Sequence, residues 1–320
     1  MSIREKQISN PFSTGGGGEH FEAHVQASFV ALMLTGGYVP CLPCGPISKI
    51  KLQGRFAGYH TDDLIVFVQD HTGRTQCKLL GQVKHSISIT ENDPIFAEVI
   101  QSAWRDFNNS EVFTKGKDVI ALITGPLSAT DIYDVRTILD WAKHLEDSAE
   151  FFRNVKLANF SSDAKRTKLK AFRSNLKKAN GGKEVPDEET FDFLRHFHLL
   201  GYDLDIKAGV TLALLHSLIG QYSPDAQSLW ARLVNEVQSA NQNAGTISAA
   251  SLPVDLLTAF KQRRTETIPD EFVIPRAPKS PRIPSEQAHA AALTVAALLG
   301  RWDESSEPDL EIIRRLVGGF

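Results

Sequence analysis

The stretch YHTDDLIVFVQDHTGRTQCKLLGQVKHSISI, residues 59–89, decides the fold. It holds two apolar runs, at residues 64–68 and 77–84, and the polar segment QDHTGR separates them. Apolar runs of this length that are bounded by turn residues are typical of two β-strands joined in a hairpin. We therefore predict a β-hairpin at this position, with the rest of the chain arranged around it.

Polar residues stand where the predicted hairpin begins and ends. The first strand opens on Asp62 and Asp63, and the second strand ends on Gln82, Val83 and Lys84. Because side chains alternate between the two faces of a strand, Gln82 and Lys84 share one face while Val83 points into the core. A carboxylate at the start of one strand can then meet an amide and a lysine across the ladder. Since Mg2+ prefers oxygen ligands, this arrangement predicts a divalent-metal site with a cation beside it.

The pattern resembles the PD-(D/E)XK nuclease superfamily in a variant form, in which glutamine replaces the usual glutamate of the E-x-K element. By that resemblance Asp63 is a metal ligand that Asp62 assists, Gln82 completes the metal shell and Lys84 steadies the attacking water. The metal implied is Mg2+, with Mn2+ as a substitute. Such an ion polarises the phosphate and activates a bound water, and a lysine stabilises developing negative charge. Compared with a glutamate, Gln82 gives the site one negative charge fewer, so one-metal and two-metal catalysis both stay open. The choice between Asp62 and Asp63 as the metal ligand also stays open.

A helix near the N-terminus is expected to supply a further ligand. Apolar residues recur at helical spacing in EHFEAHVQASFVALMLTGG, and the pair Gly36 and Gly37 ends the pattern. In the resembled superfamily such a helix often sends a glutamate toward the metal, so Glu22 is the candidate and Glu19 its substitute. The alternative is that both glutamates are solvated charges near the helix N-terminus.

The remaining elements predict an α/β fold. We expect a strand within residues 47–56, a helix that Asp93 and Pro94 open, and a buried strand at residues 119–124. The order of helix, strand, hairpin, helix, strand and helix suits an α/β sandwich, and it matches the common core of the PD-(D/E)XK fold. We therefore predict a restriction-endonuclease-like sandwich at residues 10–127, followed by a mainly helical domain at residues 128–262.

Residues 163–183 form a predicted helix of one charge sign. The segment carries eight basic residues against one acid, a net charge of +7 in a chain whose total is −3. A solvated helix face usually mixes signs, whereas one-signed clustering is typical of phosphate binding. We expect this helix to contact the backbone of double-stranded DNA through Lys165, Arg166, Lys168, Lys170, Arg173, Lys177 and Lys178.

Composition sets the remaining bounds. The chain has 320 residues, of which 42% are hydrophobic, and no apolar run is long enough to span a bilayer. The first residues lack the apolar core of a secretory signal, and three cysteines make no disulfide framework. We expect a cytoplasmic protein with no membrane partner. Prolines mark residues 263–285 as a stiff linker, and residues 286–320 as the start of a further C-terminal region.

Four segments together narrow the resemblance: GGGGEHFEAHVQA, HTDDLIVFV, QVKHS and FAEVIQSAW. They look like the N-terminal nuclease effector domains of bacterial antiviral defence proteins, which precede STAND-type NTPases of the Avs kind or nucleotide sensors. The resemblance covers residues 10–260 and implies an endonuclease that cuts double-stranded DNA when C-terminal regions outside this chain form a homo-oligomer. The chain has no P-loop, so we expect no ATPase in it. The alternative is a non-catalytic DNA-binding or protein-docking module.

Overall fold

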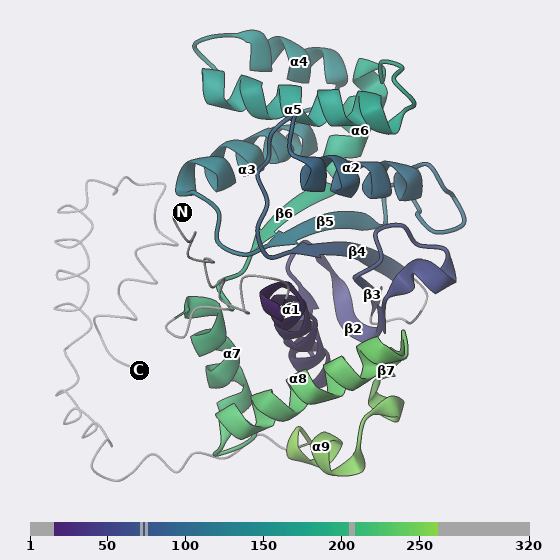
Figure 1. Ribbon diagram of the computed structural model, residues 1–320, viewed down its shortest axis with the longest axis vertical. Coiled ribbons are helices and arrows are strands. Elements are labelled where there is room, and N and C mark those ends of the chain that lie inside the picture. The colour runs from purple at the N-terminus through teal and green to yellow at the C-terminus, as the bar shows by residue number, and fades with distance from the viewer. Residues whose placement is uncertain (1–15, 71–72, 74–75, 205–208, 262–320) are drawn as a thin grey trace, which may run out of the picture. The chain divides into compact units, whose positions relative to one another are not determined.

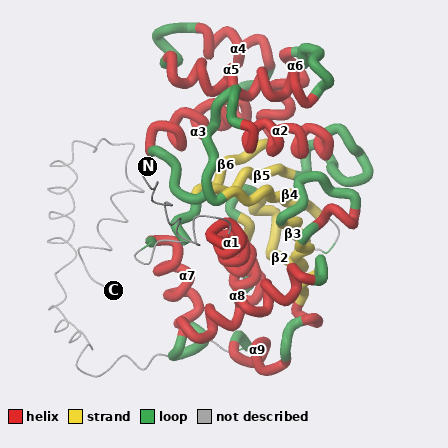
Figure 2. Tube along the Cα trace, in the orientation of Figure 1, coloured by secondary structure: helices red, strands yellow, loops and turns green. Residues whose placement is uncertain are grey.

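A computed structural model describes residues 16–70, 73, 76–204 and 209–261 (Figure 1). These residues form a mixed β-sheet with helices on both of its faces, as Figure 2 shows. The strands are β1 (Tyr38–Val39), β2 (Leu42–Leu52), β3 (Leu64–Gln69), β4 (Gln76–Lys84), β5 (Val119–Thr124), β6 (Phe197–Gly201) and β7 (Thr246–Ser248). The helices are α1 (Gly16–Leu34), α2 (Pro94–Phe107), α3 (Ala129–His144), α4 (Ser148–Lys156), α5 (Asp163–Ala179), α6 (Asp187–His196), α7 (Val210–Gly220), α8 (Ala226–Gln242) and α9 (Val254–Ala259). Two 3-10 turns are η2 (Gly54–Ala57) and η3 (Ala249–Ser251).

The predicted hairpin is the centre of the sheet. Strands β3 and β4 pair antiparallel, from Leu64 opposite Gly81 to Gln69 opposite Gln76. Strand β2 is antiparallel to β3, whereas β5 and β6 continue the sheet in parallel from β4. The predicted order of helix, strand, hairpin, helix, strand and helix is confirmed, and the fold class is α/β.

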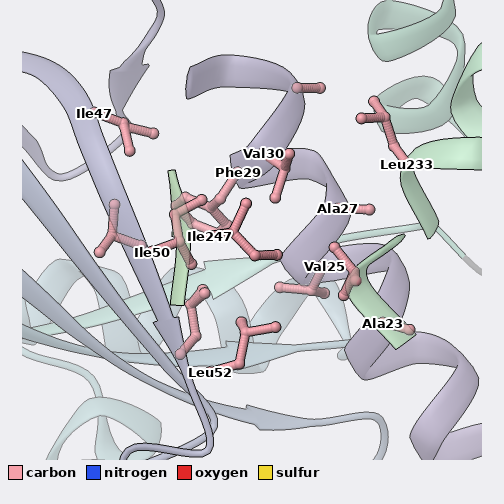
Figure 3. Close-up of a cluster of buried hydrophobic side chains, with 14 of the residues drawn as sticks. Ala23, Val25, Ala27, Phe29, Val30, Ile47, Ile50, Leu52, Leu233 and Ile247 are labelled. Carbon is pink, nitrogen blue, oxygen red and sulfur yellow. The ribbon is translucent and has the colours of Figure 1, made fainter. Parts of the chain in front are cut away.

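Helix α1 is the core of one side of the sheet. Side chains that alternate along β3 separate the two faces: Leu64 and Val66 join the cluster around α1, and Ile65 joins the cluster on the other face. Figure 3 shows α1 between β2 on one side and Leu233 of α8 on the other. Because it is enclosed in this way, α1 buries alanines such as Ala27 as well as its predicted apolar stripe.

Aromatic rings fill the opposite side of the sheet. The rings of Phe96 in α2 and Phe172 in α5 meet edge to face, with their centroids 5.2 Å apart. Phe172 also meets Phe197 of β6 at 5.5 Å. Such contacts stabilise a core beyond the apolar area that they bury. Helix α5 therefore uses one face for core packing, and only its remaining faces are open to other roles.

The domain boundary differs from the one expected at residues 127 and 128. Strand β6 pairs with β5, and β7 pairs with Lys49–Lys51 of β2, so segments of the expected helical domain complete the sheet. All described residues belong to one compact unit. Sequence reasoning missed β6 because it follows α6 directly, with no Gly or Pro between them to signal a change of element. The expected linker and C-terminal region, residues 263–320, lie outside the described residues.

Strand β2 also differs from the expectation at both ends. It begins at Leu42, before the expected start at residue 47, and it includes Pro43 and Pro46. Prolines are tolerated there because this part of β2 lies in the short edge hairpin with β1. It ends at Leu52 rather than at residue 56, and the η2 turn follows. The three cysteines are free, as expected, and Cys77 is buried. Within the described ranges, no helix is both long enough and apolar enough to cross a bilayer.

Close packing between β2 and the end of β3 gives a first prediction. A Cβ atom at Gly45 would lie 2.1 Å from the backbone oxygen of Gln69, which cannot move without displacing the strand. We expect Gly45→Ala to lower the free energy of unfolding by roughly 1–3 kcal/mol, the usual cost of overpacking. Gly18→Ala is the matched control, because a Cβ atom there meets nothing within 4 Å. Urea unfolding of both variants tests this, and equal midpoints would contradict it.

Candidate functional site

The site lies where β3 starts and β4 ends. Since Leu64 pairs with Gly81, Asp63 comes opposite Gln82. Its Oδ2 atom accepts hydrogen bonds from Gln82 Nε2 at 2.5 Å and from the backbone N–H of Val83 at 2.8 Å. The structure thus brings Asp63 and Gln82 into direct contact, and it buries Val83 in the core around α1.

Asp62 takes a different place from Asp63. Its Oδ2 atom lies 3.1 Å from Nε of Arg55, and its backbone oxygen accepts from Gly54 N at 2.6 Å. Both contacts tie Asp62 to the η2 turn. Of the two acids that the sequence left as alternatives, Asp63 is the one in contact with the end of β4.

Asp106 of α2 fixes the segment that leads into these acids. It is fully buried, and its carboxylate accepts from the backbone N–H groups of His60 at 2.9 Å and Thr61 at 2.6 Å. Burial raises the pKa of Asp106, and the two backbone bonds oppose that effect. Sequence reasoning missed this residue. Its signal was an acid at helical spacing from Val99 and Ala103, on the buried face of α2.

Glu22 of α1 reaches the same region through a network of amides. Its Oε1 atom accepts from Gln26 Nε2 at 2.9 Å and from Gln53 Nε2 at 2.8 Å. Gln26 Nε2 also donates to the backbone oxygen of Asp63 at 2.8 Å, and Gln26 Oε1 accepts from Asn241 of α8 at 2.5 Å. Gln26 and Gln53 therefore donate to one carboxylate oxygen, and Gln26 links it to α8 and to the backbone at the start of β3.

Gln53 stands in a strained backbone conformation. Its φ of 48° and ψ of 59° are left-handed, which is uncommon for a residue other than glycine, asparagine or aspartate. Strain of this kind costs on the order of 1–3 kcal/mol and clusters at functional sites. Here it accompanies the bond from Gln53 to Glu22. Nothing in the sequence distinguished Gln53 from a strand residue, and it was missed for that reason.

The two carboxyl groups hold their protons more tightly than usual. Burial, followed by the charge of Asp63, raises the pKa of Glu22 to about 7, while the bond from Gln26 and the charge of Lys84 oppose the rise. Burial also raises the pKa of Asp63 to about 6, against the bond from Val83 N and the charge of Lys84. Glu22 and Asp63 are therefore close enough to repel each other, and full ionisation of both is costly.

Lys84 ends β4, opposite Thr124 of β5, and is half-buried. Its charge acts on both Glu22 and Asp63, but within the part of the chain that the structure describes it forms no ion pair. Glu19, the substitute for Glu22, is exposed, and together with Glu22 it lines a hollow of about 590 Å3. The hydrogen-bonding network of Glu22 does not include Glu19.

The donor atoms suit a hard cation. Among the described residues, hydrogen bonds use only Oδ2 of Asp63 and Oε1 of Glu22, so each carboxyl keeps one oxygen for another partner. In the part of the chain that the structure describes, no group of three or more His, Cys, Asp and Glu side chains is gathered to hold a metal. Two carboxylates and the amide oxygen of Gln82 nevertheless fit Mg2+, which often takes one or two carboxylates and fills its shell with water and substrate phosphate.

The basic side chains of helix α5 pair with acids and backbone oxygens of the same protein. Lys165 Nζ lies 3.0 Å from Asp134 of α3 with both side chains buried, and Lys168 Nζ lies 2.6 Å from Asp131. The other predicted DNA contacts are engaged as well: Arg166 with Asp163, Lys170 with Glu91, Arg173 with Asp187, Lys177 with Glu184, and Lys178 with the backbone oxygen of Glu91. The run is one-signed in the sequence but not in the fold, because acids from other segments pair with it. Contact between this helix and DNA stays a prediction.

No protein-family model, curated protein or solved structure matches the chain. Function is therefore inferred from the site itself. Its groups offer oxygen atoms of the kind that a divalent cation takes, and the charge of Lys84 acts on both carboxyls. Neutral amides hold Glu22 and Asp63 in place. Oxygen ligands with a positive charge beside them are compatible with chemistry on a phosphate ester.

The raised pKa values predict how stability depends on pH. Between pH 4.5 and about 7 the folded chain keeps a proton on Glu22 that the unfolded chain has lost, so stability falls as pH rises through this window. The glutamine of Glu22→Gln cannot ionise. We therefore expect the free energy of unfolding of this variant to exceed that of the parent by at most roughly 3 kcal/mol at pH 8, and by little at pH 4.5. Urea unfolding in EDTA measures this, with the exposed Glu19→Gln as control. Parallel pH profiles for the parent and Glu22→Gln would contradict it.

The ion pairs of α5 predict unequal effects of removing its lysines. Lys165→Met leaves Asp134 buried without its partner, which should cost roughly 3–5 kcal/mol of unfolding free energy. Lys170→Met breaks an exposed pair with Glu91 and should cost less than about 1 kcal/mol. Urea unfolding of both variants checks this. If Lys165→Met is as stable as Lys170→Met, the buried pair does not have the stabilising role assigned to it.

Proposed function

We propose that the chain is a metal-dependent nuclease that hydrolyses phosphodiester bonds in DNA. The observation that carries the proposal is the convergence of Glu22 and Asp63, from α1 and the start of β3, with Gln82 and Lys84 of β4. Each carboxyl has a raised pKa, so the protein alone does not fully compensate their charge. A divalent cation would supply that compensation.

Each residue has a proposed role. Glu22 and Asp63, with the amide oxygen of Gln82, would hold Mg2+ or, as a substitute, Mn2+. When bound, the ion polarises the phosphate and lowers the pKa of a bound water. Lys84 places a positive charge beside the carboxyls, where negative charge develops on the phosphate or the attacking water.

Other residues hold this arrangement in position. Gln26 and Gln53 orient Glu22 through their bonds to its Oε1 atom. Asp106 fixes the approach to β3. Ligands that are held by neighbouring hydrogen bonds need less reorganisation when they bind.

The finer fold assignment is part of the proposal. Helix α1 precedes the antiparallel strands β2, β3 and β4, and α2 then crosses over to the parallel strand β5. This order and pairing support a restriction-endonuclease-like sandwich, to which β6 and β7 are additions. The preference for double-stranded DNA, the role as an antiviral effector and activation by oligomerisation rest on resemblance in sequence alone, and they stay predictions.

The alternative of a non-catalytic module accounts poorly for the site. A purely structural position would lose nothing if a neutral glutamine replaced Glu22, and it would avoid the repulsion from Asp63. Costly charges that are held close together are typical of functional sites. We therefore favour catalysis over a docking role.

Cleavage by variants tests the proposal. Asp63→Asn removes one charge from the ligand set, and Lys84→Met removes the neighbouring cation, so we expect each to lower Mg2+-dependent DNA cleavage by about 100-fold or more. Plasmid nicking and linearisation, with EDTA as the metal-free reference, measures the rate. Lys115→Met is the control, because that lysine is exposed, pairs with Asp192 of α6 and belongs neither to the site nor to the predicted DNA contacts. Cleavage by Lys84→Met at the parent rate would refute the assignment, provided that both proteins melt alike.

A further inference from the structure

An exposed aromatic residue stands beside the proposed site. Phe56 is 90% exposed, which is the largest value for a large hydrophobic side chain among the described residues. It belongs to the η2 turn. Two residues just before it contact the site: Arg55 pairs with Asp62, and Gln53 donates to Glu22. The ring is therefore open to contact with a partner.

The η2 turn presents this ring on a fixed base. Gly54 N donates to the backbone oxygen of Asp62 at 2.6 Å, and Gly58 N donates to that of Arg55 at 3.0 Å. Gly58 has a φ of 89°, which a residue with a Cβ atom adopts only with strain. A ring on a preorganised turn loses little further freedom when a partner packs against it.

Phe56 lines a groove that leads to Glu22. The groove encloses about 620 Å3 and is lined by Lys51, Gln53, Phe56, Asn241, Gln242 and Asn243. Three of these residues, Gln53, Asn241 and Gln242, also line the hollow that contains Glu22. The two hollows therefore adjoin, with Phe56 at the far end and the carboxylate at the near end.

The lining is rich in amides and poor in free cations. Lys51 donates through Nζ to the backbone oxygen of Ala244, which uses one of its three donors. Amides both donate and accept, and glutamine and asparagine are suited to the edges of nucleobases. A surface that follows the backbone of a duplex needs several cations, and this groove does not offer them.

Resting on the proposed nuclease function, we propose that this groove binds an unpaired strand of the DNA substrate beside the cleavage site, with Phe56 stacked on a base. An aromatic ring can stack on any base whose face is open. In a duplex both faces of each base are already covered by neighbouring base pairs. The substrate class is then single-stranded, forked or locally melted DNA, in place of the fully paired DNA that the resemblance in sequence implies. The amides contact base edges and sugars along the groove.

Binding to matched oligonucleotides tests this inference. The Asp63→Asn protein, which should not cleave, is titrated against fluorescein-labelled single-stranded, forked and fully paired DNA of one sequence. We expect the added change Phe56→Ala to weaken binding to the single strand and the fork by about 5- to 100-fold, and binding to the duplex by less than about 2-fold. Phe56→Trp should keep the affinity. The control is Tyr133→Ala, which removes another exposed aromatic ring, at 64% exposure, from α3.

Stacking has its own readout. A 2-aminopurine base in the single strand should lose fluorescence on binding, and Phe56→Ala should prevent that loss. Equal affinity of Phe56→Ala and its parent for the fork, or a preference for the duplex, overturns this inference while Mg2+-dependent cleavage by the wild type keeps the nuclease proposal. Phe56-dependent self-association in light scattering, without any effect of DNA, also overturns it. Absence of both cleavage and binding for every DNA overturns the proposed function itself.

Discussion

The bond from Val83 N to the carboxylate of Asp63 is the contact on which the site depends. It continues the β3–β4 ladder by one step beyond the last backbone pair, with a side chain in place of a carbonyl. The register of two strands therefore fixes the position of a charge. A slip of one residue would send Asp63 to the opposite face of the sheet and remove it from Gln82. The apolar side chains of β3, buried on both faces, hold that register.

Local pattern was enough to predict the elements that carry the site. Strands at residues 64–68 and 77–84, the capped helix after Asp93, and Glu22 on a helix all follow from periodicity and end signals in short windows of sequence. The residues that were missed depend on contacts between distant segments. Gln26 meets Asn241 across 215 positions, and His60 meets Asp106 across 46. No window of sequence contains either pair.

Helix α5 shows why a run of charge does not by itself predict a binding surface. Its cations looked unpaired because their partners lie in α3, in the segment around Glu91 and beyond the end of the helix. Side chains of α5 also hold the segment that follows β4: Lys168 donates to the backbone oxygen of Ile89, and Asn175 donates to that of Thr90. Helix α5 therefore supports the segment five to six residues after Lys84. The charges of α5 form contacts within the protein.

Several buried acids of the chain are neutralised by a cation in a way that Glu22 is not. Asp62, Asp118 and Asp134 are buried, and each is paired with an arginine or a lysine. Glu22 receives only neutral amide donors, which position a charge without cancelling it. Burial and the charge of a neighbouring acid then raise the pKa of Glu22 to about 7. The charge of Lys84 offsets this rise only in part, and the charge that stays uncompensated is what a bound divalent ion would neutralise.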